Sequence, residues 1–256
     1  MNASFEAPRA GLAAWPDAVV ELRQYTLRPG TRDTLVELFE REFVESQEAL
    51  GMHVIGQFHD LDRPDRFVWL RGFASMPERA RALQAFYGGP VWQRHRDAAN
   101  GTMLDSDDVL LLRPARAGAG FAQAASSRPR DAADTPVDTV LVAGICRLAG
   151  PAEAGFAAAF EAQLRPLLQR HGAALRACLV TEPASNTFPR LPVREGEQVF
   201  VWFAGFESMD AHLVHLATLA RDPDWRLAIE RARAQGLLEP PAWLRLRPTP
   251  RSELRA

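Results

Sequence analysis

The pattern of hydrophobic and polar positions occurs twice along the chain. Short β-rich runs begin at Val19 and at Val140, 121 positions apart, and each is followed by a turn that contains Gly and Pro. At the same offset both copies carry an apolar i, i+4, i+8 stripe, which is typical of the buried face of a helix. The stripes are Leu35, Phe39 and Phe43 in the first copy and Phe156, Phe160 and Leu164 in the second. The chain is therefore an internal repeat.

A second pair of matching strands extends the repeat. Residues 67–76 (FVWLRGFASM) and 200–209 (FVWFAGFESM) lie 133 positions apart, so the second copy has gained 12 residues. The extra residues fall around Asn186 to Gly196, where prolines and a glycine favour a loop. Each half then reads β-α-β-β-α-β. Strands are predicted near 19–27, 53–60, 66–74 and 108–113, then near 139–148, 174–182, 198–206 and 242–247, and helices near 32–50, 76–99, 152–171 and 209–234.

This order of elements predicts an α+β fold with two tandem ferredoxin-like domains, each a four-stranded antiparallel sheet with both helices on one face. The domains are expected at residues 17–115 and 138–250, joined by an Ala/Gly/Ser/Pro-rich linker at 116–137. The helix-free face of each sheet is rich in Phe, Trp and Leu and would not stay exposed. We therefore expect the two bare faces to meet in a barrel-type pseudo-dimer, with a chamber between the sheets as the candidate site.

Composition narrows the chemistry that this fold can carry. All 30 basic residues are arginine, because the sequence contains no lysine. Enzymes that depend on a lysine amine, such as Schiff-base and phosphate-loop enzymes, are excluded. A formal net charge of −2 with scattered arginines gives no nucleic-acid footprint. The apolar runs are too short for membrane insertion and the N-terminus lacks a signal pattern, so a cytoplasmic protein is expected.

Three segments resemble the NIPSNAP family, and the resemblance covers both halves of the chain as two tandem NIPSNAP-like domains. The segments are Glu21 to Gly30 (ELRQYTLRPG), Val68 to Phe73 (VWLRGF) and the helix break at Trp92, which is repeated as Asp222-Pro-Asp-Trp225. That family belongs to the dimeric α+β barrel group, so the resemblance implies a barrel of two ferredoxin-like units, supplied here by one chain. It implies no particular reaction, because NIPSNAP proteins largely lack an assigned activity. Neighbouring barrel families include cofactor-free monooxygenases, isomerases and haem-handling enzymes.

Period-two alternation on the first strand places Glu21, Arg23 and Tyr25 on one face and Val20 and Leu22 on the other. We expect the apolar face to meet the helices and the polar face to line the chamber. Arg23 would hold an anionic group and Tyr25 would donate a hydrogen bond, while His59 or Glu21 would move a proton. Glu21, Tyr25 and His59 are thus the candidate catalytic residues. The structural alternative is a Glu–Arg pair that neutralises itself, with Tyr25 filling space.

Six further side chains complete the candidate site. Gln57 shares a face with His59, whereas Trp69 and Arg71 on the third strand and Trp92 and His95 after the helix break are placed to close the chamber. The predicted substrate-binding residues are Arg23, Gln57, Trp69, Arg71, Trp92 and His95. For both tryptophans core packing is the alternative, because each has a counterpart in the second half.

The polar candidates have no such counterparts. Glu21, Arg23 and Tyr25 correspond to Val142, Gly144 and Cys146 in the second half. We therefore expect the site in the first half, with the second half as an apolar wall. Two cysteines are too few for a disulfide framework. No metal site or cofactor is predicted, and His212 and His215 are expected on a solvated helix face.

The leading functional hypothesis is a small-molecule ligand, partly apolar and anionic, bound in the barrel chamber. It could undergo a cofactor-independent monooxygenase-like oxidation or an isomerisation. The alternative is a non-catalytic scaffold or protein-interaction module, for which the chamber would be filled by side chains. Exposed strand edges or helices could also support a homo-oligomer.

Overall fold

Each half of the chain folds in the order of elements that the repeat predicts. The structure is a computed structural model and describes residues 17–122, 128 and 138–255. The elements of the first half are β1 (Val19–Leu27), α1 (Arg32–Leu38), η1 (Phe39–Phe43), α2 (Val44–Glu48), β2 (His53–Asp60), β3 (Arg66–Phe73), α3 (Met76–Gly88), α4 (Pro90–Thr102) and β4 (Met103–Pro114). Those of the second half are β5 (Val140–Arg147), η3 (Ala152–Ala154), α5 (Phe156–Ala159), η4 (Phe160–Leu164), α6 (Arg165–Arg170), β6 (Ala174–Thr181), β7 (Val199–Phe206), α7 (Met209–Arg221), α8 (Pro223–Ala234) and β8 (Ala242–Pro248).

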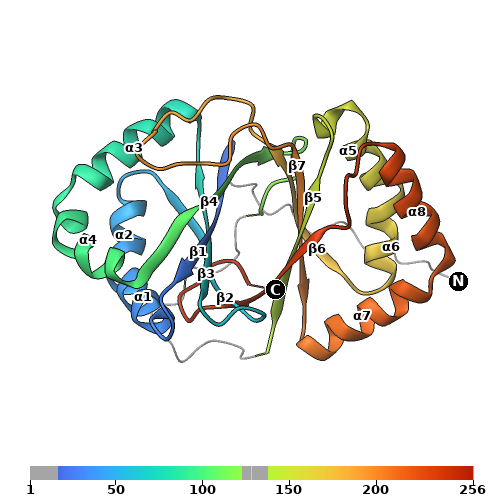
Figure 1. The fold of residues 1–256 in the computed structure, drawn as a ribbon, viewed down its shortest axis with the longest axis horizontal. Helices are drawn as coiled ribbons and strands as arrows, with labels where there is room; N and C mark the ends of the chain where they lie inside the picture. Colours follow the sequence, from blue (N-terminus) through green and yellow to red (C-terminus); the bar gives the residue numbers. More distant parts are fainter. Residues whose placement is uncertain (1–16, 123–127, 129–137, 256) are drawn as a thin grey trace, which may run out of the picture.

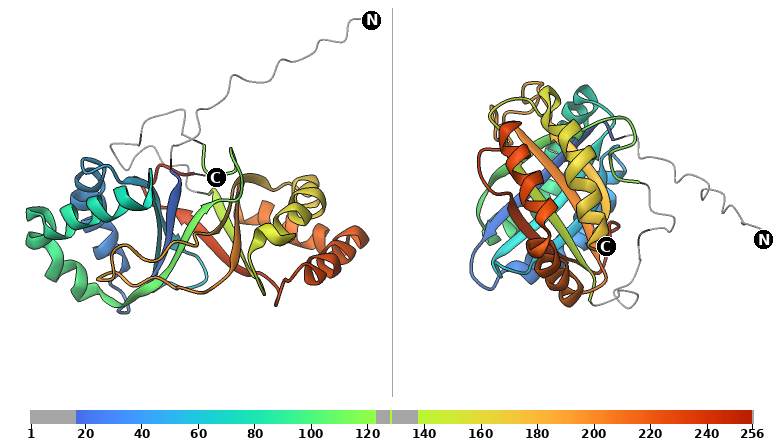
Figure 2. Two further views of the ribbon diagram at one scale, coloured as in Figure 1. Left: turned by 90° about the horizontal axis from the view of Figure 1, so that it is seen from above. Right: turned by 90° about the vertical axis from the view of Figure 1, so that its right-hand side faces the viewer.

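The strands of both halves close into one antiparallel barrel. Their order around it is β1-β3-β2-β8-β5-β7-β6-β4, so the halves join where β2 pairs with β8 and β4 pairs with β6. The helices of each half cover the outside of their own sheet, and the barrel lies between two helical layers (Figures 1 and 2). The predicted pseudo-dimer of two ferredoxin-like units is confirmed. Most of the predicted linker at 116–137 lies outside the described residues.

The interior of the barrel is an apolar core built by both halves. Val20 and Leu22 of β1 pack there with residues such as Leu141 and Phe203 of the second half. The chamber expected between the sheets is thus occupied by side chains, and the predicted orientation of β1 is wrong. Glu21, Arg23 and Tyr25 face the helices of the first half instead. Both faces of this strand are buried, so the barrel interior takes the face that carries Val20 and Leu22, whereas Glu21, Arg23 and Tyr25 find partners under the helices.

Two details of the helices repeat between the halves. The helix predicted near 32–50 contains a π-helical turn at Phe39–Phe43, and the second half has one at the equivalent Phe160–Leu164. Ser75 caps α3, because its hydroxyl accepts a hydrogen bond from the amide of Glu78 at 3.2 Å, and Ser208 caps α7 in the same way, accepting from the amide of Ala211 at 3.1 Å. The carboxylate of Glu78 pairs with Arg81 rather than reaching back to the cap.

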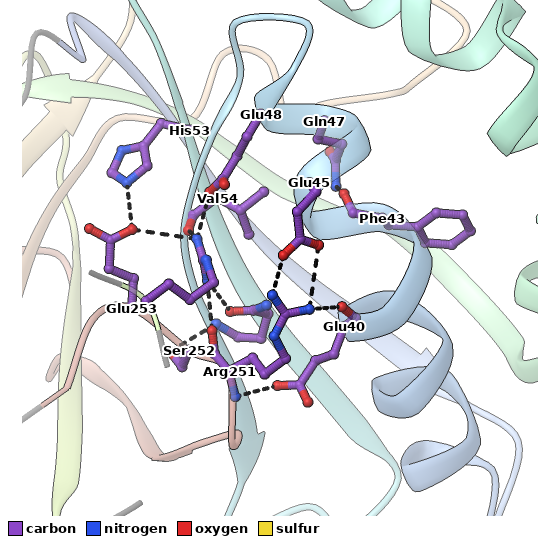
Figure 3. A network of polar contacts seen from close by, with 12 residues as sticks. Glu40, Phe43, Glu45, Gln47, Glu48, His53, Val54, Arg251, Ser252 and Glu253 are labelled. Carbon is purple, nitrogen blue, oxygen red and sulfur yellow. Dashed lines mark hydrogen bonds and ion pairs between the residues drawn. The ribbon is translucent and has the colours of Figure 1, made fainter. Parts of the chain in front are cut away.

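The segment that follows β8 returns to the first half and fastens to it (Figure 3). The amide of Arg251 donates to the carboxylate of Glu40 at 2.8 Å, and its guanidinium pairs with Glu45. Glu253 lies 3.4 Å from the ring of His53 in β2. These contacts join the end of the second half to α2, η1 and β2, in addition to the two strand pairings.

His212 and His215 in α7 are buried, which corrects the expectation of a solvated helix face. Both are 1% exposed, and their rings pack on Phe206 with centroids 4.8 and 5.0 Å away. His215 Nδ1 contacts the carbonyl of His171 at 2.8 Å. Neither ring nitrogen of His212 has a hydrogen-bond partner among the described residues. Burial, helped by the neighbouring His215 and Arg245 and opposed by Asp62, lowers the pKa of His212 from 6.5 to about 4.

The depressed pKa of His212 predicts a loss of stability in mild acid. The unfolded chain binds a proton at this histidine near pH 6.5, whereas the folded chain does not until about pH 4, so the stability present above pH 6.5 is lost as the pH falls. We expect this residue to account for about 2 kcal/mol of the free energy of unfolding lost between pH 7 and pH 4. Urea unfolding across this range should show a shallower pH dependence for His212→Phe and His212→Gln. Equal slopes in wild type and variants would contradict the assignment.

Candidate functional site

A carboxylate with three arginines lies between the sheet and the helices of the first half. The register of β1 and β3 places Arg71 opposite Glu21, and the first turn of α3 brings Arg79 above them. Glu21 Oε2 accepts from Arg23 Nη1 at 2.8 Å and from Arg71 Nε at 2.7 Å, and Oε1 accepts from Arg79 Nε at 2.6 Å. All four residues are 0% exposed. We call these residues the charge cluster; its formal charges leave an excess of two positive charges.

Glu21 is an anchor for these cations rather than a base. Burial raises the pKa of its carboxyl group, but attraction to Arg71, Arg23 and Arg79 outweighs burial and holds the pKa well below its usual range. Other side chains accept hydrogen bonds from some of the remaining guanidinium nitrogens. Arg71 Nη1, for example, donates to the side-chain oxygen of Gln47 at 3.1 Å. Within the described chain, Nη2 of Arg71 and Nη2 of Arg79 have no hydrogen-bond partner. The cluster is therefore short of acceptors.

Tyr25 contacts the charge cluster through its hydroxyl group and also lines a neighbouring cavity. Its hydroxyl oxygen accepts a hydrogen bond from Arg23 Nε at 2.9 Å, and its ring stands edge-on to Trp69 with centroids 6.0 Å apart. Burial raises the pKa of Tyr25 more than the nearby Arg23 lowers it. The side chain is accordingly a neutral phenol at physiological pH, and its own proton is left to donate.

A cavity of about 80 Å³ lies next to Tyr25, between β1 and β3 on one side and the helices on the other. Its walls are mainly aromatic, and two of the rings, Phe39 and Phe43, come from the π-helical turn. The lining residues are Tyr25, Leu35, Phe39, Phe43, Gln47, Trp69, Phe86, Tyr87, Trp92, Asn100, Met103, Ser106 and Leu191. Asn100 is exposed, and the half-buried lining residues are Tyr87, Trp92, Met103, Ser106 and Leu191, so these residues mark the open side.

A second hollow, of about 450 Å³, lies at one end of the barrel. Strand ends from both halves surround it, and its lining includes Gln24, Arg66, Asp108, Arg194 and Trp243. Arg194 Nη1 contacts Asp108 at 2.9 Å, and Arg66 Nη1 donates to Gln24 at 2.9 Å. Of the described residues, four arginines and four carboxylates line this hollow, so it lacks the excess positive charge of the cluster beside the first cavity.

The structure brings six of the predicted residues together. Tyr25, Trp69 and Trp92 line the cavity, while Glu21, Arg23 and Arg71 belong to the charge cluster behind it. They meet under the helices instead of between the sheets.

Gln57, His59 and His95 do not line the cavity. His59 lies on the same sheet face as Tyr25 but two strands away, about 10 Å, and faces Asp33 at 3.9 Å. Gln57 is buried near Arg128, at 3.4 Å. His95 lies 3.4 Å from Glu42 and packs edge-on against Phe43. The proton-transfer role assigned to His59 gains no support from this position.

Sequence reasoning missed Gln47, Arg79 and Tyr87. The comparison of halves contains their signal, because the equivalent positions hold Leu168, His212 and Ala220. The second-half counterparts of these three residues are less polar, as are those of Glu21, Arg23 and Tyr25. Leu191 gave no signal, since it lies in the extra loop and has no counterpart.

The second half cannot form an equivalent site. Its Gly144 occupies the position of Arg23, and a Cβ atom there would lie 2.4 Å from the indole of Trp202. The indole therefore fills the space that the arginine side chain takes in the first half. Val142 and Cys146 replace Glu21 and Tyr25 in the same apolar core. The charge cluster belongs to the first half alone.

Residues 20–117 match the NIPSNAP family. The first half of the chain is a NIPSNAP domain. The whole chain shares its fold with a monooxygenase candidate from Lactobacillus acidophilus NCFM, at a TM-score of 0.53 and 12% identity over 93% of this chain and 98% of that one. An anthrone oxidase-like protein gives a TM-score of 0.54 and 13% identity over 90% and 91%. These identities show a common fold and nothing finer.

The NIPSNAP domain also resembles single-domain structures. A NIPSNAP-like domain protein from Burkholderia xenovorans is 28% identical over 38% of this chain and 84% of its own, with a TM-score of 0.35. No curated protein matches the sequence significantly. Within residues 17–122, 128 and 138–255, no helix is long and apolar enough to cross a bilayer, and no three His, Cys, Asp or Glu side chains gather as metal ligands would.

Removing the carboxylate of the charge cluster is predicted to be strongly destabilising. Glu21→Gln keeps the shape but leaves three buried guanidinium groups without their counter-ion, so the free energy of unfolding should fall by about 3–5 kcal/mol. Adding Arg79→Met to Glu21→Gln should restore part of this loss. Chemical denaturation measures both effects, with Glu78→Gln, at an exposed pair with Arg81, as the control that leaves the midpoint nearly unchanged. Equal effects of Glu21→Gln and Glu78→Gln would refute the role of the cluster.

Proposed function

We propose that the NIPSNAP domain binds a small molecule with an aromatic or apolar body and an electron-rich oxygen, in the cavity beside Tyr25. One observation carries the proposal: the Tyr25 hydroxyl belongs to a cavity-lining residue and is held by Arg23, a member of a buried cluster with excess positive charge. The aromatic walls suit the body of such a ligand, and the cluster suits its oxygen.

The chemistry of this arrangement is polarisation of an oxygen atom. Tyr25 would donate its proton in a hydrogen bond to a carbonyl, enolate or phenolate oxygen, and the cations behind it would favour negative charge there. Of the described residues that line the cavity, none is a carboxylate, a histidine or an arginine. A reaction would therefore suit a ligand that ionises readily, such as a phenol or an enolisable ketone.

An enzymatic version of the proposal is a cofactor-independent oxidation or an isomerisation through an enolate. Oxidation would consume dioxygen, with one oxygen atom bonded to the ligand carbon in place of two hydrogens and the other released as water. The names of two proteins that share the fold, a monooxygenase candidate and an anthrone oxidase-like protein, agree with such a ligand class. An oxygen electrode distinguishes this version from binding alone.

An interaction module is the second candidate function. The packed barrel interior favours it, as do apolar side chains exposed on the outer helices of the second half. Leu213 and Val214 in α7 and Leu227 in α8 are 47%, 62% and 51% exposed. If these residues mediate self-association, light scattering should report a homo-oligomer that Val214→Glu disrupts.

The small-molecule proposal predicts that Tyr25→Phe weakens binding of phenol about fivefold to tenfold, the worth of one hydrogen bond to a neutral donor. The substitution removes only the hydroxyl group, so the aromatic wall stays in place. Isothermal titration calorimetry on the full chain measures the change.

The matched control is Trp202→Phe, at the second-half counterpart of Trp69. It alters an aromatic core of similar build without a charge cluster, and phenol affinity should stay within a factor of about two of wild type. Equal losses in both variants, or no binding of phenol to the wild type, would count against the proposal.

A further inference from the structure

The extra residues of the second half cross onto the first half. We call residues 186–196 the strap; it precedes β7 and reaches α3 (Figure 1). At its start, the side-chain oxygens of Asn186 and Thr187 accept hydrogen bonds from Arg79 Nη1 at 3.0 and 3.2 Å. At its end, the amide of Arg194 donates to the carbonyl of Val109 at 2.9 Å. Both ends of the strap are thus fixed to the NIPSNAP domain, the first end through the charge cluster.

Between these attachments the strap supplies apolar side chains to the candidate site. Phe188 stacks on Tyr87 with centroids 5.9 Å apart and planes inclined by 25°. Leu191 lines the cavity itself, on the open side that Tyr87 also borders. Val193 packs against the same hydrophobic core but does not line the cavity. The wall between the ligand space and solvent is therefore partly made by the other half.

We propose that the strap determines which ligands the NIPSNAP domain accepts, with Leu191 as the residue that sets the size limit and Phe188 holding Tyr87 beside it. This inference rests on the proposed function, since it concerns the same cavity. It assigns the second half a role in specificity: single-ring phenols fit, and fused-ring phenols are excluded by the strap.

Volume and rigidity support this assignment. An engineered cavity of about 150 Å³ accommodates benzene, so a cavity of about 80 Å³ takes one ring only if a wall yields. The inner wall cannot yield easily, because Phe39, Phe43 and Trp69 are buried in the core. The residues on the open side are less buried: Leu191 and Tyr87 are half-buried, as are Trp92, Met103 and Ser106 of the first half. The side of the cavity that adjusts to the ligand is therefore the open side, to which the strap contributes Leu191 directly and Tyr87 through its contact with Phe188.

The test compares phenol with 2-naphthol by isothermal titration calorimetry on the full chain. Leu191→Ala should raise the affinity for 2-naphthol relative to phenol by about tenfold, the usual scale of discrimination by a few apolar carbons. Val193→Ala is the matched control, because it shortens the same strap against the same core away from the cavity, and it should leave the ratio unchanged. Should Leu191→Ala fail to fold, Phe188→Ala, which frees Tyr87, should shift the ratio in the same direction.

The outcomes separate the two proposals. If wild type binds phenol and Leu191→Ala and Val193→Ala give the same ratio, the strap does not set specificity, but the proposed function stands. If no form of the protein binds either phenol, both proposals fall. A raised ratio in Leu191→Ala alone supports the strap as the specificity element.

Discussion

Three arginines that share one buried carboxylate impose the main constraint on the first half. Charges removed from water are tolerated only when partners surround them, and Glu21 satisfies one nitrogen of each guanidinium with its two oxygens. The remaining guanidinium nitrogens donate to other side chains. Arg71 donates to Gln47 of α2 and Arg23 to Tyr25 of β1. Arg79 donates to Asn186 and Thr187 of the second half. The cluster therefore specifies how β1, β3, α2, α3 and the strap lie relative to one another.

The second half shows the same scaffold without this constraint. Its strands and π-helical turn repeat those of the first half, because these features depend on apolar contacts between sheet and helices, and the hydroxyl of Ser208 caps α7 as that of Ser75 caps α3. Where the charges are absent, small residues take their places and Trp202 lies over Gly144. The neutral, buried His212 stands where Arg79 does in the first half. Scaffold and site can thus change independently in this fold.

The sequence predicted the scaffold well and the position of the site less well. Repeated periodicity located the strands, the helix break and the extra loop, since each leaves a local pattern. The alternation in β1 also grouped Glu21, Arg23 and Tyr25 correctly. It could not show which face meets the helices, because this strand is buried on both sides and the decision depends on the partner sheet. Leu191 was unpredictable because its contact joins residues far apart in the chain.

Because both halves belong to one chain, the charge cluster can occur in one half and the strap in the other. In a symmetric dimer of identical subunits, every change in one subunit appears in the other, so a loop that covers one cavity implies a second loop and a second cavity. Here the strap and the segment after β8 both run from the second half onto the first. No copy of the charge cluster lies beneath the helices of the second half in the described residues, since Val142 and Gly144 take its positions. The first half could therefore carry the charge cluster while the second half supplied the strap that contacts it.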